Sequence, residues 1–400
     1  MVPEGWTETR LGEIVIHRKG YAFDSKDYDQ AGRRIIRISD TTRDGIGNER
    51  VVCVPHEVAK DLETYALDTG DVLLSTVGSR PHLLDSMVGK VVRVPEGVKG
   101  ALLNQNLVRL DPISRDINRE HLFAVLKDKR FIYYISTLVR GNANQVSITL
   151  AELFQYKFSL PPLPEQKKIA EILGTWDRAI EVAEKQLKNA EAQKRALMQH
   201  LLAGTHRLKG FEDSEWKTVK LGDVCEFLDG MRKPIKAADR ATMQGQNPYY
   251  GATGIIDWVD AFIFDEPLLL LGEDGENILS RNLPHVFRIE GKSWVNNHAH
   301  VLRPKSEVSH AFVCEFLESL DYRKYNSGSA QPKLNKKVCE SIPVLLPCFE
   351  EQKAIGAILE ISDQQVHNCK AKLNHLRTEK RALMQQLLTG KKRVKVEEAA

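Results

Sequence analysis

The sequence lacks the marks of membrane, secreted and disulfide-stabilised proteins. None of its apolar runs approaches the roughly 20 residues of a membrane-spanning helix, and its first six residues do not resemble a secretion signal. The six cysteines show no CxxC spacing, so we expect reduced, mostly buried thiols and no structural metal site. Together these absences predict a cytoplasmic protein.

A strong net charge is also lacking. The 57 Lys and Arg residues against 54 Asp and Glu residues leave a net charge of +3, which is too small to indicate nucleic-acid binding by itself. The balance permits a local basic face, and a solvated surface of mixed charge explains it equally well. At 400 residues, the length favours two or three domains.

Motifs for catalysis by the chain itself are missing. NPYY at 247–250 lacks the second proline of the Asn-Pro-Pro-Tyr motif of adenine methyltransferases, and GEDG at 272–275 lacks the spacing of a nucleotide-binding loop. We find no Walker sequence and no nuclease cluster of carboxylates and lysine. His298 and His300 would share one face of a strand, but no third ligand is spaced to complete a metal site. We therefore interpret them as hydrogen-bonded structural histidines.

What the chain does contain is an internal repeat. KRALMQ at 194–199 returns at 380–385, and the same offset of 186 residues maps EQK at 165–167 onto EQK at 351–353, and Gln145 onto Gln331. An earlier match, between Trp6 and Trp216, has an offset of 210 residues. The two halves are therefore alike at their beginnings and at their ends and differ in between. This indicates one duplicated structural frame that carries two different recognition domains.

The repeated segments predict two long amphipathic helices at 161–204 and 347–390. Apolar residues recur in each at alternating steps of three and four, which is a heptad seam, and Lys194 and Lys380 are charged interruptions at equivalent positions. The seam residues are Ile172, Trp176, Ile180, Leu187, Leu197 and Leu201 in the first helix, and Ile358, Val366, Leu373, Leu376, Leu383 and Leu387 in the second.

An isolated helix would leave such a seam in water, so we expect the two helices to pair with each other; the alternative is that each packs on its own globular neighbour. A heptad seam serves parallel and antiparallel pairs alike, but duplication about an approximate twofold axis favours an antiparallel pair. We expect rods of roughly 57 Å that act as a spacer between two domains.

The remaining sequence predicts two mixed α/β domains at 1–160 and 205–346, followed after the second helix by a short charged tail at 391–400. Short apolar runs at 35–38, 71–75, 91–94 and 107–110 alternate with glycine and proline turns and predict strands. Residues 122–139 and 312–320 predict helices. The fold class is therefore α+β, with two mixed domains joined by two long antiparallel coiled-coil helices in a pseudo-twofold repeat.

Clusters of polar residues in both domains are candidates for contact with nucleic acid. Arginine, asparagine and glutamine match base edges in the major groove, whereas lysine mainly meets phosphate. For any single residue, a plain surface or turn role is the stronger interpretation, so the clusters carry the inference. The candidates are Arg18, Lys19, Tyr21, Ser79, Arg80, Asn104 and Gln105 in the first domain, and Arg232, Lys233, Lys236, Tyr249, Tyr250 and Arg281 in the second. Asn104 and Gln105 belong to a cluster that also contains Asn106.

These residues resemble one family, the specificity subunits of type I restriction-modification enzymes. The resemblance covers essentially the whole chain. It rests on LPPLPEQ at 160–166 and its copy LPCFEEQ at 346–352, on the repeats 194–204 and 380–390, and on GDVLLS at 70–75, YYGATG at 249–254 and NHAHVL at 297–302. One departure, PCFE at 347–350 in place of a second proline-rich stretch, puts the start of the second helix in doubt.

The resemblance implies a non-catalytic subunit that reads a split, asymmetric site in double-stranded DNA with its two target-recognition domains. It also implies two modification subunits that methylate adenine with S-adenosylmethionine, and restriction subunits that use ATP and Mg²⁺. No cofactor is expected on this chain itself. Two alternatives stay open at this point: the DNA-reading part of a single-chain restriction-methylation enzyme, and a coiled-coil scaffold that does not bind DNA.

Overall fold

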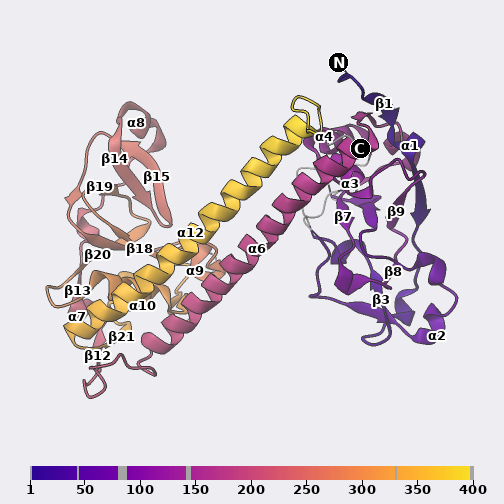
Figure 1. Cartoon of the computed structure of the whole chain (residues 1–400). Helices are drawn as coiled ribbons and strands as arrows, with labels where there is room; N and C mark the ends of the chain where they lie inside the picture. Colours follow the sequence, from indigo (N-terminus) through magenta and orange to yellow (C-terminus); the bar gives the residue numbers. More distant parts are fainter. Residues whose placement is uncertain (1, 43–44, 80–87, 141–145, 329–330, 397–400) are drawn as a thin grey trace. The chain divides into compact units, whose positions relative to one another are not determined.

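The computed structural model describes residues 2–42, 45–79, 88–140, 146–328 and 331–396 (Figure 1). The chain divides into two compact units: unit 1 comprises Met1–Val182 and Leu373–Ala400, and unit 2 comprises Ala183–Lys372. Each unit holds one mixed α/β domain and one part of each long helix, α6 (Leu163–Leu201) and α12 (Phe349–Leu387). The predicted α+β class is confirmed, and the boundaries between the compact units fall inside the two helices.

A four-stranded antiparallel sheet forms the centre of unit 1. The strand order is β2 (Val15–Lys19), β9 (Leu107–Pro112), β5 (Val72–Ser75) and β7 (Val91–Arg93). Every residue of β5 is buried, because the sheet has a hydrophobic core on each face. Val72 and Leu74 point into a core shared with helices, whereas Leu73 points into a second core on the other face.

Two helices, α3 (Arg119–Lys127) and α4 (Lys129–Leu138), pack on the first of these cores. The prediction of a single helix at 122–139 was wrong. Asp128 adopts an extended conformation (φ −70°, ψ 147°), and its carboxylate accepts a hydrogen bond from the backbone N–H of Arg130 at 3.0 Å. A side chain that caps a new helix start has thus outweighed the continuous apolar pattern.

The other elements of unit 1 complete its domain. A smaller sheet has the order β4 (Val52–Val54), β3 (Arg33–Ile36) and β8 (Leu102–Leu103), and two short antiparallel pairs join β1 (Thr7–Arg10) to β11 (Lys157–Leu160) and β6 (Val77–Gly78) to β10 (Val146–Ser147). The short helices are α1 (Leu11–Ile14), α2 (His56–Ala59) and α5 (Leu150–Leu153).

Unit 2 repeats this plan. Its central antiparallel sheet has the order β13 (Cys225–Phe227), β20 (Ala299–Pro304), β17 (Leu268–Gly272) and β18 (Val286–Ile289), and α10 (His310–Glu318) packs on it. The outer sheet has the order β15 (Gly254–Val259), β14 (Gln244–Gly251), β19 (Lys292–Val295) and β16 (Phe264–Asp265), and β12 (Lys217–Lys220) pairs with β21 (Pro343–Leu346). The short helices are α7 (Leu221–Val224), α8 (Ala237–Thr242), α9 (Asn277–Ser280) and α11 (Lys336–Glu340).

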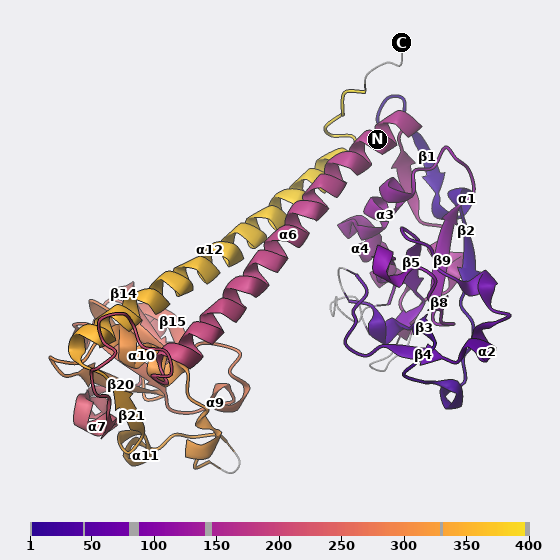
Figure 2. The same cartoon turned by 60° about the horizontal axis from the view of Figure 1, so that its bottom comes forward.

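The two long helices pair within each unit and run antiparallel (Figure 2). In unit 2 the Lys194 ammonium binds the Asp363 carboxylate, and in unit 1 Lys380 binds Asp177. Lys194 and Lys380 are equivalent in the repeat, as are Asp363 and Asp177, so each helix supplies the lysine of one pair and the aspartate of the other. Only an antiparallel pair with twofold symmetry brings equivalent residues together in this way. All predicted seam residues are buried or half-buried, so the predicted helix pair is confirmed.

The repeated Glu-Gln dipeptide attaches each helix start to its domain. The Gln166 side chain accepts a hydrogen bond from the Asn118 N–H at 2.9 Å and donates to the Pro161 carbonyl at 2.9 Å. In unit 2, Gln352 accepts from the Ser309 N–H and donates to the Pro347 carbonyl, both at 2.9 Å. One amide thus joins the start of a long helix to the start of a domain helix.

All six cysteines are free, and four of them are buried. Within the part of the chain that the structure describes, we find no helix long and apolar enough to cross a membrane.

Candidate nucleic-acid interface

In unit 2, three segments meet at one end of the central sheet. The turn after β17 begins with Glu273, whose N–H donates to the His298 carbonyl at 2.8 Å, and the Leu334 N–H donates to the Glu273 carbonyl at 2.8 Å. These bonds join the turn after β17, the turn before β20 and the segment before α11. Each of the three presents polar side chains at the edge of the sheet.

Unit 1 builds the same frame from different residues. The Thr76 N–H, directly after β5, donates to the Asn106 carbonyl at 3.1 Å, and the Ile148 N–H donates to the Thr76 carbonyl at 3.2 Å. Thr76 therefore occupies the place of Glu273, and Asn106 occupies that of His298. The two domains keep the backbone connections and change the side chains.

An asparagine forms the turn before the central strand in both units. Asn104 and Asn296 are 4% and 5% exposed. The Asn104 side-chain oxygen accepts from the Asn106 N–H at 3.4 Å, and that of Asn296 accepts from the His298 N–H at 2.8 Å. The amide thus holds the turn from inside, a common role of asparagine. Gly20 passes close to the first turn, since a Cβ there would lie 2.2 Å from the Asn104 carbonyl oxygen.

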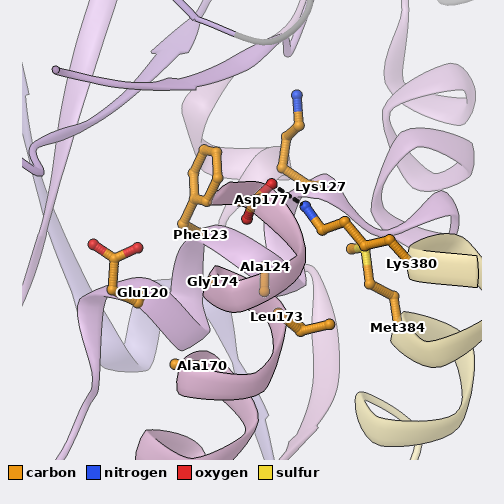
Figure 3. Close-up of a pocket in the computed structure, with 10 residues that line it drawn as sticks. All are labelled: Glu120, Phe123, Ala124, Lys127, Ala170, Leu173, Gly174, Asp177, Lys380 and Met384. Carbon is orange, nitrogen blue, oxygen red and sulfur yellow. Dashed lines mark hydrogen bonds and ion pairs between the residues drawn. The ribbon is translucent and has the colours of Figure 1, made fainter. Parts of the chain in front are cut away.

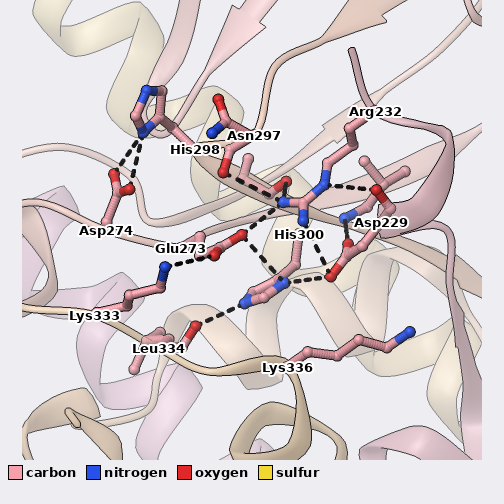
Figure 4. A network of polar contacts seen from close by, with 12 residues as sticks. Asp229, Arg232, Glu273, Asp274, Asn297, His298, His300, Lys333, Leu334 and Lys336 are labelled. Atoms are coloured by element: carbon pink, nitrogen blue, oxygen red, sulfur yellow. Dashed lines mark hydrogen bonds and ion pairs between the residues drawn. The ribbon is translucent and has the colours of Figure 1, made fainter. Parts of the chain in front are cut away.

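A buried ionic network supports the frame in unit 2 (Figure 4). The Arg232 guanidinium is 12% exposed and donates to the Glu273 carboxylate at 2.6 Å and to the Ala299 carbonyl at 2.7 Å. Lys333 lies 3.2 Å from the other oxygen of Glu273. The network thus joins the loop after β13, which contains Arg232, to the turn after β17 and to the start of β20.

His300 is a buried cation in this network. Its Nδ1 lies 2.7 Å from the Asp229 carboxylate and its Nε2 lies 2.9 Å from the Leu334 carbonyl. Both partners only accept hydrogen bonds, so both ring nitrogens carry a proton. Burial opposes the charge, but the hydrogen bonds and charges of its partners, foremost the hydrogen bond with Asp229, together outweigh burial and raise the pKa of His300 to about 10. The predicted structural role of this histidine is confirmed.

His298 is exposed to solvent, and its Nδ1 lies 2.9 Å from both carboxylate oxygens of Asp274. Among the residues that the structure describes, we find no group of three or more His, Cys, Asp or Glu side chains placed to hold a metal ion. His298 is therefore a hydrogen-bonded surface residue.

The predicted DNA-contact residues of unit 1 differ in their exposure to solvent. Tyr21 and Gln105 are exposed beside the turn, and the Gln105 N–H donates to the Tyr21 carbonyl at 2.9 Å. Lys19 is exposed on β2, and Arg18 there pairs with Asp111 at 3.4 Å. The remaining candidates are Ser79, which is half-buried, Asn104, which forms the turn, and Arg80, which lies outside the described residues.

In unit 2, several of the predicted DNA-contact residues bind other groups of the same unit. Arg232 belongs to the ionic network, and Arg281 donates to the Glu318 carbonyl at 2.6 Å. The Tyr249 ring is buried and its hydroxyl accepts from the Ile235 N–H at 2.9 Å. Half-buried Tyr250 packs beside Phe287, whereas Lys233 and Lys236 are exposed.

Internal contacts therefore favour a structural role for Asn104, Arg232, Tyr249 and Arg281. The assignment of the exposed candidates to DNA contact stays a prediction. Sequence reasoning placed Asn106 in a polar cluster with Asn104 and Gln105 and weighed His298 only as a metal ligand; it did not single out Asn297 and Lys333 as site residues. An alignment of NQN at 104–106 with NNH at 296–298 would have identified Asn297 and His298 as candidates for contact with DNA.

A small cavity of about 20 Å³ lies between α3 and the helix pair of unit 1 (Figure 3), lined by Glu120, Phe123, Ala124, Lys127, Ala170, Leu173, Gly174, Asp177, Lys380 and Met384. This is room for about one water molecule. In unit 2, Glu315 of α10 approaches Lys194, the repeat equivalent of Lys380, at 3.2 Å. The cavity is thus a packing difference between the units, and its size excludes a substrate.

Comparisons with known proteins agree with this duplicated architecture. A family model described as the type I restriction modification DNA specificity domain matches residues 3–192 and again 213–378. The chain is 29% identical over 418 residues to a protein of Methanocaldococcus jannaschii described as the type I restriction enzyme MjaX specificity subunit, covering 98% of this chain and 95% of that protein.

The MjaVIII specificity subunit of the same organism is 26% identical over 431 residues, covering 98% of this chain and 94% of the relative. The crystal structure of a type I restriction-modification S subunit from M. genitalium shares the fold, with a TM-score of 0.67 at 16% identity, over 97% of this chain and 96% of that one.

Proposed function

Since the chain belongs to the family defined by the type I restriction modification DNA specificity domain, we infer that it is the DNA-recognition subunit of a restriction-modification complex. Each of its two domains reads one part of a split, asymmetric site in double-stranded DNA. The observation that carries this proposal is the pair of equivalent backbone frames with unlike side chains. Two domains of one plan but different surface chemistry suit two different half-sites.

The catalytic steps belong to partner subunits in this proposal. Two modification subunits carry S-adenosylmethionine and methylate adenine, and restriction subunits use ATP and Mg²⁺ to cleave. The chain itself is non-catalytic, carries no cofactor and works in the cytoplasm. The support for this division is the resemblance of the whole chain to specificity subunits, together with the missing methyltransferase motif at 247–250.

The helix pair has a separate role in the proposal. Because α6 and α12 are continuous across the boundary between the compact units, their length sets the spacing of the two half-sites along the duplex. A coiled-coil scaffold without DNA binding would need no unlike domains, so the differing side chains of the two frames favour recognition over scaffolding.

A domain exchange tests the function. The chain is assembled with its modification subunit, residues 1–160 are replaced by those of a relative with another specificity, and methylated adenines are mapped. We expect a change in one half of the recognised site and none in the other half. Changes in both halves would contradict separate reading.

S-adenosylmethionine binding separates the proposal from the single-chain enzyme. We expect the purified chain to bind none and the assembled complex to bind it. Sequence-specific methylation by the chain alone would refute the division of labour, and a complex that methylates DNA without sequence preference would favour the scaffold.

A further inference from the structure

The asparagine turn is a surface feature that both recognition domains retain. In unit 1 the buried Asn104 is followed by the exposed Gln105 and Asn106, and in unit 2 the buried Asn296 is followed by the exposed Asn297 and His298. Both turns lead directly into the central strand of their sheets, β9 and β20.

The backbone fixes the direction in which each turn presents its exposed residues. The carbonyl of its third residue, Asn106 or His298, accepts the N–H of the residue that follows the neighbouring strand, Thr76 or Glu273. The buried asparagine holds the turn from the other side. Gln105 and Asn297 therefore occupy equivalent positions relative to the two sheets.

Both equivalent positions carry a primary amide. The Gln105 and Asn297 side chains make no hydrogen bond to another side chain or backbone group within the described parts of the chain (for Asn297, Figure 4 shows contacts of its carbonyl only). Amide N–H groups are common donors to phosphate oxygens. The residues that surround the turn differ in charge between the units, with Thr76 in the place of Glu273 and Ser147 in the place of Lys333.

A feature that two domains share cannot carry the difference between two base sequences. What two half-sites have in common is the sugar-phosphate backbone, whose geometry is the same for every sequence. A retained turn with free amide donors fits that common partner, and the differing side chains around it are left to distinguish bases.

We propose that the turns at 105–106 and 297–298 hold the DNA backbone, one turn at each half-site, and that they do not read bases. This inference rests on the proposed function in DNA recognition. At the second turn, Nδ1 of His298 faces Asp274, so Nε2 is the ring nitrogen available to the DNA. The proposal revises the role of Gln105, which the sequence placed among candidates for base contact.

The test uses the full chain assembled with its modification subunits. The variants are Gln105→Ala, Asn297→Ala and the double variant, with Gln30→Ala and Asn282→Ala as matched controls that remove exposed amides elsewhere in the same domains. Affinity is measured on duplexes with the recognised site and on duplexes of unrelated sequence, and methylated sites are mapped.

Each single alanine variant should weaken binding to both duplexes by the same factor, about fivefold for the loss of one hydrogen bond, while the methylated sequence stays unchanged. The controls should bind as the wild type does. Wild-type affinity in the double variant, or relaxed base preference in either half-site, would overturn the proposal.

Amide-preserving variants separate contact from folding. Gln105→Asn and Asn297→Gln retain the donor, so we expect both to keep more than half of the wild-type affinity. If these variants lose affinity as the alanine variants do, the amide donor is not the cause and the proposal is wrong. If the wild-type complex itself shows no sequence preference, the proposed function fails, which is a different outcome.

Discussion

Glu165 and Glu351, at equivalent positions of the repeat, are almost completely buried. Trp6 and Arg393 donate hydrogen bonds to Glu165. Burial by itself would raise the pKa of this carboxyl, but these hydrogen bonds outweigh the effect of burial and lower the pKa. Trp216 and Arg207 make the same contacts with Glu351. A buried carboxylate is stable only with such partners, so each set ties the beginning of a domain to the beginning of a long helix.

Removing the arginine tests this contact. Arg393→Ala should lower the unfolding midpoint of unit 1 by roughly 5 °C, because Glu165 keeps its burial and loses two hydrogen bonds. Arg207→Ala should act likewise on unit 2. The measurement is thermal unfolding with hydrogen exchange to assign the unit, and Lys391→Ala, an exposed neighbour, is the control. An unchanged midpoint in both arginine variants would contradict the role of the contact.

Glu315 is a mostly buried carboxyl, with its side chain 12% exposed, and its pKa shifts in the direction opposite to that of Glu165. Burial raises its pKa above the ordinary 4.5, and Lys194 offsets this only partly. The equivalent place in unit 1 is Ala124, which lines the small cavity beside Lys380. Among the described residues, two carboxylates, Glu315 and Asp363, share Lys194 in unit 2, whereas Lys380 in unit 1 pairs with Asp177 alone.

The pH dependence of stability follows from this difference. The folded protein holds the Glu315 proton more tightly than the unfolded chain does, so the free energy of unfolding of unit 2 decreases as the pH rises above about 4.5. Glu315→Gln should remove this slope and gain on the order of 1 kcal/mol at pH 8. Denaturant unfolding at pH 5, 6.5 and 8 checks it, with exposed Glu307→Gln as the control. Parallel pH profiles of wild type and Glu315→Gln would disprove the assignment.

At the scale of elements, the helix pair contains one lysine and one aspartate in each half of its seam. A heptad seam alone allows several registers, and a polar residue at a core position selects one of them at some cost in stability. Because Lys194 meets Asp363 while Lys380 meets Asp177, a shift of one helix along the other would break both pairs at once. The pairs therefore specify direction and register.

Exchange of the charges tests this role in unit 1, where, among the described residues, no second carboxylate pairs with the lysine. Lys380→Asp places two carboxylates together and should cost about 2 kcal/mol, and adding Asp177→Lys should recover at least about 1 kcal/mol of it. A double-mutant cycle by denaturant unfolding measures the coupling. The same exchange at the exposed Lys168 and Glu171 pair should change stability by less than about 0.5 kcal/mol. Additive effects at Lys380 and Asp177 would show that the pair does not select the register.

At the scale of the whole molecule, both ends of the chain contribute to unit 1, whereas unit 2 is one continuous segment. Arg393, near the end of the chain, donates to the Glu4 carbonyl at 2.8 Å as well as to Glu165. The duplicated halves are thus completed by each other's helices. The helix that leaves one domain supplies part of the other unit.

A matched insertion tests the helices as a spacer. Four residues inserted after Lys188 alone should displace one Lys–Asp pair and destabilise the protein. Four residues inserted after both Lys188 and Asn374, its repeat equivalent, should retain both pairs and lengthen each helix by about 6 Å. We expect the spacer between the half-sites to grow by one or two base pairs, with the same bases read in each.

Mapping of methylated adenines measures the spacer in the wild type and in both insertion variants. An unchanged spacer with full activity in the doubly inserted protein would mean that another part of the complex sets the distance. A stable, active protein after the single insertion would instead contradict the register argument.

The sequence by itself determined the duplicated plan, the two long helices and their seam. These features are visible because sequence identity and heptad spacing are properties of neighbouring residues, which need no knowledge of distant partners. The same reasoning found the central strands, since they are short apolar runs bounded by turns. It missed the break between α3 and α4, because one capping side chain decided it.

Only the tertiary structure decided which polar residues face the solvent. Arg232, Tyr249 and Arg281 have the chemistry of DNA contacts, yet their partners Glu273, Ile235 and Glu318 bind them inside unit 2. Arg232 and Glu273 lie 41 residues apart in the sequence, so no local pattern reveals the pair. The free amides of Gln105 and Asn297 became distinguishable from the buried Asn104 and Asn296 only when the fold placed one of each pair inside and one outside.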